Sequence, residues 1–152
     1  MERYAAKLGA DCAFFITSES AYATGIGNIL QPIDADQNQL KGYFICLVKP
    51  PVAVSTGKAY AAITPRHPEI NCREAVRHDI EEWKDLLTND FEEPVFAMHP
   101  ELKAIKEELY RVGAVFALMS GSGSTVFGIF RQHPGDLSPL FPGCFTTTLK
   151  LQ

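Results

Sequence analysis

A short run of small residues could bind a phosphate group. It consists of Ser120, Gly121, Ser122, Gly123 and Ser124, with apolar runs before and after it. Glycine adopts positive φ at little cost, so such a turn can aim several backbone N–H groups at one point. A concavity of this kind, with hydroxyls around it, suits a phosphate oxygen. The run lacks both a Walker A lysine and the third glycine of G-x-G-x-x-G, so a plain hairpin connection is the competing interpretation.

A second candidate is a single carboxylate, Asp11, which stands between a turn and an apolar run. It is the only charged residue between Lys7 and Glu19. Its spacing alone favours a turn or helix-capping aspartate.

The bulk composition limits the class of protein that could present these groups. The 152 residues are 46% hydrophobic and 21% charged, which predicts one globular domain with a real core. The formal net charge is −4, so a nucleic-acid-coating surface is not expected. No apolar run approaches the roughly 18 residues of a membrane helix, and no signal peptide opens the chain.

The four cysteines are scattered, with no C-x-x-C pair and no histidine at metal-ligand spacing. They are expected to be buried free thiols rather than metal ligands. Free thiols suit a reducing compartment, so a cytoplasmic location is predicted.

The elements that must position these groups follow from the pattern of apolar residues. Residues 1–8 resemble the last turns of a helix, which hints at a preceding segment. Strands are expected in residues 21–30 (two, around a tight turn), 43–48, 114–119, 125–130 and 144–149. Helices are expected at 58–63, from Asn71 to Leu87 with Trp83 in the core, and from His99 to a stop at Gly113. Without βαβ alternation, the pattern predicts an α+β fold, with helices on one face of a mostly antiparallel sheet.

Four stretches, taken together, resemble one protein family. They are Leu8-Gly9-Ala10-Asp11-Cys12-Ala13-Phe14-Phe15, Lys49-Pro50-Pro51-Val52-Ala53-Val54-Ser55-Thr56, Asn89-Asp90-Phe91-Glu92 and Met119-Ser120-Gly121-Ser122-Gly123-Ser124. The family is the 4-diphosphocytidyl-2-C-methyl-D-erythritol kinases of non-mevalonate isoprenoid synthesis, within the GHMP kinase superfamily. The fold that this resemblance implies is the GHMP kinase C-terminal domain, a ferredoxin-like layer.

The resemblance also implies a longer protein. The family's substrate-facing lysine and long ATP-binding loop have no match in this sequence. The chain is therefore expected to be the carboxy-terminal portion of such a kinase, inactive alone. Residues 1–32 would be a remnant of the N-terminal kinase domain, and residues 33–152 would form the C-terminal domain.

By the same resemblance, Asp11 matches the catalytic aspartate, and residues 120–124 match a loop that supports the ATP phosphates. Tyr60 matches an aromatic residue that stacks on cytosine, and Thr56 and Ser55 are expected in the same pocket. Ala13 and Thr24 depart from the family pattern, at positions that do not touch the chemistry.

The implied cofactors are ATP and Mg²⁺. The implied partners are the cytidine diphosphate-linked substrate and an N-terminal half of the same protein, and a homodimer stays open. Two alternatives stand beside this hypothesis. One is a regulatory α+β module that binds a small anion, and the other is a different GHMP kinase, for homoserine or a mevalonate derivative.

Overall fold

The computed structural model describes residues 14–17, 19–33, 39–64 and 68–152. The chain divides into two compact units, residues 1–39 and residues 40–152. The expected helix at residues 1–8 and the candidate Asp11 lie outside the described residues. The domain boundary expected at residues 32 and 33 stays a prediction.

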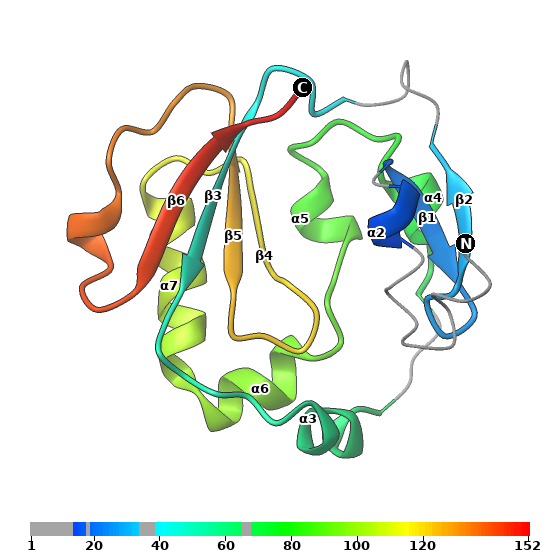
Figure 1. Cartoon of the computed structure of the whole chain (residues 1–152), viewed down its shortest axis with the longest axis horizontal. Coiled ribbons are helices and arrows are strands. Elements are labelled where there is room, and N and C mark those ends of the chain that lie inside the picture. Colours follow the sequence, from blue (N-terminus) through cyan, green and yellow to red (C-terminus); the bar gives the residue numbers. More distant parts are fainter. Residues whose placement is uncertain (1–13, 18, 34–38, 65–67) are drawn as a thin grey trace. The chain divides into compact units, whose positions relative to one another are not determined.

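The described residues of the first unit form one helical turn and a two-stranded hairpin (Figure 1). The turn is α2 (Phe14–Thr17), and the hairpin pairs β1 (Ala21–Thr24) with β2 (Ile29–Pro32) in antiparallel register. Gly25 and Gly27 have φ values of 68° and 90° in the connecting turn, a conformation that favours glycine. The two short strands predicted around a tight turn are confirmed.

The second unit is built on a four-stranded antiparallel sheet. Its strands are β3 (Phe44–Lys49), β4 (Phe116–Met119), β5 (Val126–Phe130) and β6 (Phe145–Lys150). Their order in the sheet is β4-β5-β3-β6, so the first and third strands of this unit pair at its centre. This is the strand order of a ferredoxin-like layer. The short 3₁₀ helix η3 (Ser138–Leu140) stands in the connection where that pattern has its second helix.

The connection from β3 to β4 carries all the α-helices described in this unit. They are α3 (Thr56–Ala62), α4 (Cys72–Ala75), α5 (Trp83–Leu86), α6 (Glu92–Met98) and α7 (Pro100–Arg111). The expected long helix is confirmed as α7, which has proline in its first turn and Gly113, at φ 99°, just after its end. Helix α6 was not expected, because Pro94 breaks the apolar pattern there. Pro94 nevertheless falls in the first turn, where its missing N–H costs nothing.

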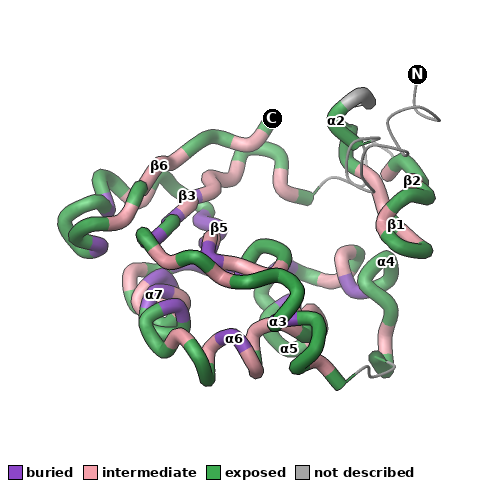
Figure 2. Tube along the Cα trace, turned by 60° about the horizontal axis from the view of Figure 1, so that its bottom comes forward, coloured by how far each residue is buried: buried purple, intermediate pink, exposed green. Residues whose placement is uncertain are grey.

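One face of the sheet packs against α7 and holds most of the core. Leu102 and Leu109 of α7 are fully buried against strand residues such as Val48 and Val126, and the buried positions of Figure 2 gather on α7, β3 and β5. A Cβ at Gly128 would lie 3.3 Å from the Cδ2 of Leu109 on α7, so glycine lets α7 and the strand approach closely. The α+β prediction is confirmed.

Two core groups on or near this face have perturbed acidity. The Tyr110 hydroxyl donates to the Ala117 carbonyl at 3.2 Å, and burial raises the pKa of Tyr110 above its usual value. Burial also raises the pKa of the Cys46 thiol. Cys46 is a buried free thiol as predicted, whereas Cys72 is exposed, so the expectation of buried thiols was wrong for Cys72.

The opposite face of the sheet is covered in part by a bent segment rather than by the single helix expected from Asn71 to Leu87. Helix α4 ends at Ala75, and α5 begins only at Trp83. The Trp83 indole N–H donates to the carbonyl of His78 at 3.0 Å, and the Glu82 N–H, its partner in a continuous helix, donates instead to Asp79. The bend brings Trp83 edge-to-face onto Phe116, with ring centroids 5.6 Å apart. The predicted core position of Trp83 is confirmed.

Candidate functional site

The serine- and glycine-rich run forms the turn between β4 and β5. The Ser120 N–H donates to the Thr125 carbonyl at 2.8 Å, and the Gly123 N–H donates to the Ser120 carbonyl at 3.0 Å. Gly121 and Gly123 have φ values of 55° and 90°. The hairpin expected from the sequence is therefore present, and its two glycines occupy conformations that other residues rarely adopt.

The two loop glycines should differ in their tolerance of a side chain. A Cβ at Gly123 would lie 2.9 Å from Met119 Sδ, whereas a Cβ at Gly121 would meet nothing within 4 Å. We expect Gly123→Ala to lower the free energy of unfolding by about 2 kcal/mol and Gly121→Ala by about 1 kcal/mol. Urea unfolding of both variants checks this, and equal losses would contradict the close packing at Gly123.

The loop presents donors that the protein itself does not use. In the described part of the chain, the amide N–H groups of Gly121 and Ser122 donate no hydrogen bond. The Ser122 and Thr56 hydroxyls lie 3.0 Å apart. Ser124 is buried, and its hydroxyl donates to the Pro50 carbonyl at 3.5 Å. Ser124 thus ties the loop to the chain after β3, while Gly121 and Ser122 offer N–H groups to an anion.

Asn89 holds the loop from the side of α6. Its amide Nδ2 donates to the Met119 carbonyl at 2.7 Å and to the Gly121 carbonyl at 2.8 Å. Its Oδ1 accepts the Phe91 N–H at 3.0 Å. One side chain therefore fixes two carbonyls of the loop and the start of α6 at once.

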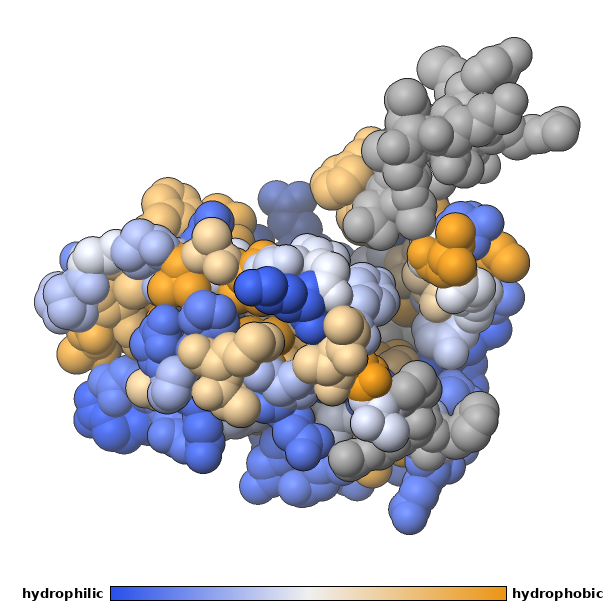
Figure 3. Space-filling model, turned by 90° about the horizontal axis from the view of Figure 1, so that it is seen from below, coloured by the Kyte–Doolittle hydropathy of each residue, from blue (hydrophilic) through white to orange (hydrophobic). Residues whose placement is uncertain are grey.

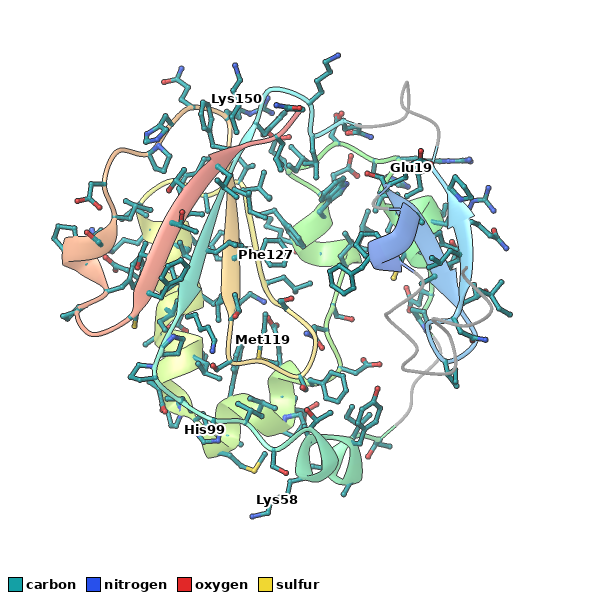
Figure 4. The ribbon with its side chains drawn as sticks, viewed as in Figure 1. Glu19, Lys58, His99, Met119, Phe127 and Lys150 are labelled. Atoms are coloured by element: carbon teal, nitrogen blue, oxygen red, sulfur yellow. The ribbon has the colours of Figure 1, made fainter. Side chains whose placement is uncertain are left out.

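Glu92 fixes the strand that leads into the loop. Its Oε1 accepts the Met119 N–H at 2.9 Å, and its Oε2 lies 2.6 Å from the Lys106 Nζ. The two side chains are only 14% and 21% exposed, so little water weakens their attraction. Figure 4 shows Met119 beside the β4–β5 loop, above α6.

The three candidate residues of α3 play different structural parts. Ser55 is the N-cap of α3, and its hydroxyl accepts the Lys58 N–H at 3.4 Å. Thr56 contacts the loop through Ser122. Tyr60 is 66% exposed, and its ring packs edge-on against Phe91 with centroids 4.9 Å apart. A tyrosine fixed by a neighbouring ring and otherwise open to solvent leaves a face free for a flat ligand.

Tyr60 and the loop open onto one cleft. It has a volume of about 710 Å³ and is lined by Tyr60, Asn89, Ser120, Gly121 and apolar residues that include Leu118 and Phe127. Figure 3 views the face that carries α3 and α6, where apolar side chains gather among hydrophilic ones. The structure thus brings Tyr60 to the same cleft as Gly121, which lies far from it in the sequence, whereas Ser55, Thr56 and Ser122 do not line this cleft.

Sequence reasoning missed the residues that hold the site together. Asn89, Glu92 and Lys106 received no role, although Asn89 and Glu92 stand in one of the four stretches that carry the resemblance. The available signal for Asn89 and Glu92 was the cluster of polar residues between the two helices expected on either side of them. Lys106 gave no signal in the sequence, because the helical pattern of α7 fits a solvent-facing lysine at this position equally well.

Among the described residues, no group of three or more histidine, cysteine, aspartate or glutamate side chains could hold a metal ion. In that same part of the chain, no helix is both long and apolar enough to cross a membrane.

Comparison with known proteins identifies the domain. Residues 72–137 match the family model described as GHMP kinases C terminal. The chain contains a GHMP kinase C-terminal domain. The crystal structure of a 4-(cytidine 5'-diphospho)-2C-methyl-D-erythritol kinase superposes on 99% of the chain and 57% of that protein, with a TM-score of 0.76 and 26% identity.

Curated relatives of this GHMP kinase domain carry one name. A 4-diphosphocytidyl-2-C-methyl-D-erythritol kinase of Bacteroides thetaiotaomicron is 55% identical over 133 residues, which cover 88% of the chain and 47% of that protein. The kinase of Bacteroides fragilis is 48% identical over 154 residues, which cover 99% of the chain and 54% of that protein. The resemblance seen in the sequence is confirmed. The chain spans about half the length of the curated relatives it matches.

Proposed function

We propose that this chain forms part of an enzyme that transfers a phosphoryl group from ATP to a hydroxyl of 4-diphosphocytidyl-2-C-methyl-D-erythritol, in non-mevalonate isoprenoid synthesis. The observation that carries the proposal is the shared cleft, which is lined both by Tyr60 and by Ser120 and Gly121 of the Ser120–Ser124 loop. Two ligands side by side match that arrangement, with a cytosine base at Tyr60 and the ATP phosphates at the loop. The relatives named for this activity support the same substrate.

The loop suits the phosphates of ATP. The amides of Gly121 and Ser122, with the Ser122 and Thr56 hydroxyls, offer hydrogen bonds to oxygens whose charge grows during transfer. ATP supplies the phosphoryl group when bound, and Mg²⁺ is the metal expected from the kinase class. The described residues fit the phosphate oxygens but offer no cluster that would hold the metal.

Tyr60 suits the cytosine base of the substrate. A flat ring offers any base a π-face, and such stacking is worth roughly 1–3 kcal/mol in single-stranded nucleic-acid binders. The edge contact with Phe91 holds the Tyr60 ring in place, so less side-chain entropy is lost on binding.

Further parts of the proposal rest on the sequence. Asp11 would accept the proton of the attacking hydroxyl, and an N-terminal half would supply the main ATP loop, so the chain alone would be inactive. We propose that residues 1–32 belong to that first domain and residues 33–152 to the second. A cytoplasmic location and a homodimer stay predictions.

Binding measurements with a Tyr60→Leu variant test the proposal. We expect it to weaken binding of the cytidine diphosphate-linked substrate roughly tenfold and to leave binding of pyrophosphate unchanged, as measured by calorimetry. Phe145→Leu is the matched control, because Phe145 is 64% exposed and Tyr60 66%, but Phe145 lies on β6 and does not line the cleft.

The same assay separates the alternatives. Binding of pyrophosphate with no preference for cytidine would favour a small-anion module. Tighter binding of homoserine or a mevalonate derivative would favour another GHMP kinase. Equal losses in Tyr60→Leu and Phe145→Leu would overturn the assignment of Tyr60.

A further inference from the structure

We propose that Asn89 is a positioning residue that orients the Gly121–Ser122 peptide, so that the free Ser122 N–H of the Ser120–Ser124 loop faces a phosphate group. The inference rests on the proposed function and adds a residue to it. Asn89 lies 32 positions from Gly121 in sequence, and its side-chain amide group donates to two carbonyls of this region. It acts through the loop.

The hydrogen bonds of Asn89 determine which way the loop peptides face. In a trans peptide unit, the carbonyl of one residue and the N–H of the next point in opposite directions. The Gly121 carbonyl points at the Asn89 amide, with a separation of 2.8 Å, so the Ser122 N–H points away from Asn89. The Met119 carbonyl also points at this amide, at 2.7 Å, and the Ser120 N–H accordingly donates across the hairpin to Thr125.

The loop needs such a restraint because its own backbone supplies little. Gly121 is exposed and has a positive φ. A Cβ added to it would meet no atom of the described residues within 4 Å, so no packing at its Cα restrains it. Glycine also loses more conformational freedom on ordering than any other residue. Without Asn89, the Gly121–Ser122 peptide could rotate and present a carbonyl where an N–H is required, and a carbonyl repels phosphate oxygen.

The side-chain oxygen of Asn89 is linked to Tyr60, the residue proposed to stack on the base, through Phe91. Its Oδ1 accepts the Phe91 N–H at 3.0 Å, and Phe91 carries the edge contact with Tyr60. An aspartate at position 89 would keep this acceptor and lose both N–H donors to the loop. The single change Asn89→Asp therefore removes the support of the loop and keeps the contact with Phe91, so its effects on phosphate binding and on base binding can be told apart.

The first arm of the test does not depend on any ligand. In ¹⁵N-labelled protein, the amides of Gly121 and Ser122 should be rigid in the wild type and gain nanosecond motion in Asn89→Asp and Asn89→Ala, as reported by relaxation order parameters. Unchanged order parameters in both variants would overturn the proposal. Order parameters across β3 and α7 report whether the fold is intact.

The second arm measures binding of pyrophosphate and of cytidine separately. Asn89→Asp should weaken pyrophosphate binding roughly tenfold and leave cytidine binding unchanged, because the Phe91 contact survives. Thr88→Asp is the charge control, since it adds the same carboxylate one residue away on the lining of the same cleft. Equal weakening by Thr88→Asp would assign the effect to charge and overturn the positioning role.

The two arms distinguish this inference from the proposed function. If the wild-type chain extended through its natural upstream residues binds neither pyrophosphate nor ATP, the proposed function fails, and the order parameters still decide whether Asn89 orients the loop. If pyrophosphate binds and Asn89→Asp changes neither motion nor affinity, the positioning role fails while the proposed function stands.

Discussion

Asp11→Asn is expected to lower kcat for phosphoryl transfer by about 10²–10⁴-fold, the usual contribution of a general base, and to leave substrate KM nearly unchanged. Phosphoryl transfer leaves a protein little to do beyond positioning, charge neutralisation and accepting the proton of the nucleophile. Asparagine has nearly the shape of aspartate but cannot take up that proton. The measurement is steady-state kinetics of the chain extended through its natural upstream residues, because the ATP loop is expected there.

Asp136→Asn is the matched control for that experiment. The Asp136 carboxylate accepts the Ser138 N–H at 2.9 Å before η3, and hydrogen bonding by the side chain of Ser138, followed by that of its backbone N–H, lowers the pKa of Asp136. The change removes one carboxylate from a surface turn and should leave kcat as it is. A kcat for Asp11→Asn equal to that of the control would show that Asp11 is a turn residue, which is the competing interpretation from its spacing.

Glu92→Ala should lower the free energy of unfolding by about 2–4 kcal/mol, because it leaves two groups without a partner. The Met119 N–H loses its acceptor, and the Lys106 ammonium, whose side chain is 21% exposed, loses its counter-charge. Glu92→Gln should cost less, since its amide oxygen can still accept the Met119 N–H. Chemical denaturation at neutral pH provides the measurement.

Glu107→Ala offers a matched control on α7. Glu107 pairs with Lys103 at 3.7 Å, and both side chains are more than 60% exposed, so this pair should contribute below about 0.5 kcal/mol. High salt should leave the Glu92 effect largely in place, because a shielded pair is screened little. A loss for Glu92→Ala no greater than for Glu107→Ala would mean that the ion pair does not hold β4.

The sequence by itself determined the elements whose signals are local. The apolar spacing of α7 and its end at Gly113, the hairpin around Gly25 and Gly27, and the central strand β3 each depend on neighbours within a few residues. The four family stretches also identified the domain and its loop. These features follow from periodicity and from backbone preferences that each residue carries wherever it lies.

Only the tertiary structure decided the bend between α4 and α5 and the support of the loop. The spacing from Asn71 to Leu87 fits one helix, but the Trp83 indole takes the His78 carbonyl and packs on Phe116. Asn89 and Glu92 meet Met119 across 30 and 27 positions of sequence. Partners so distant leave no periodic trace, because a hydrogen bond depends on distance and direction in the folded chain.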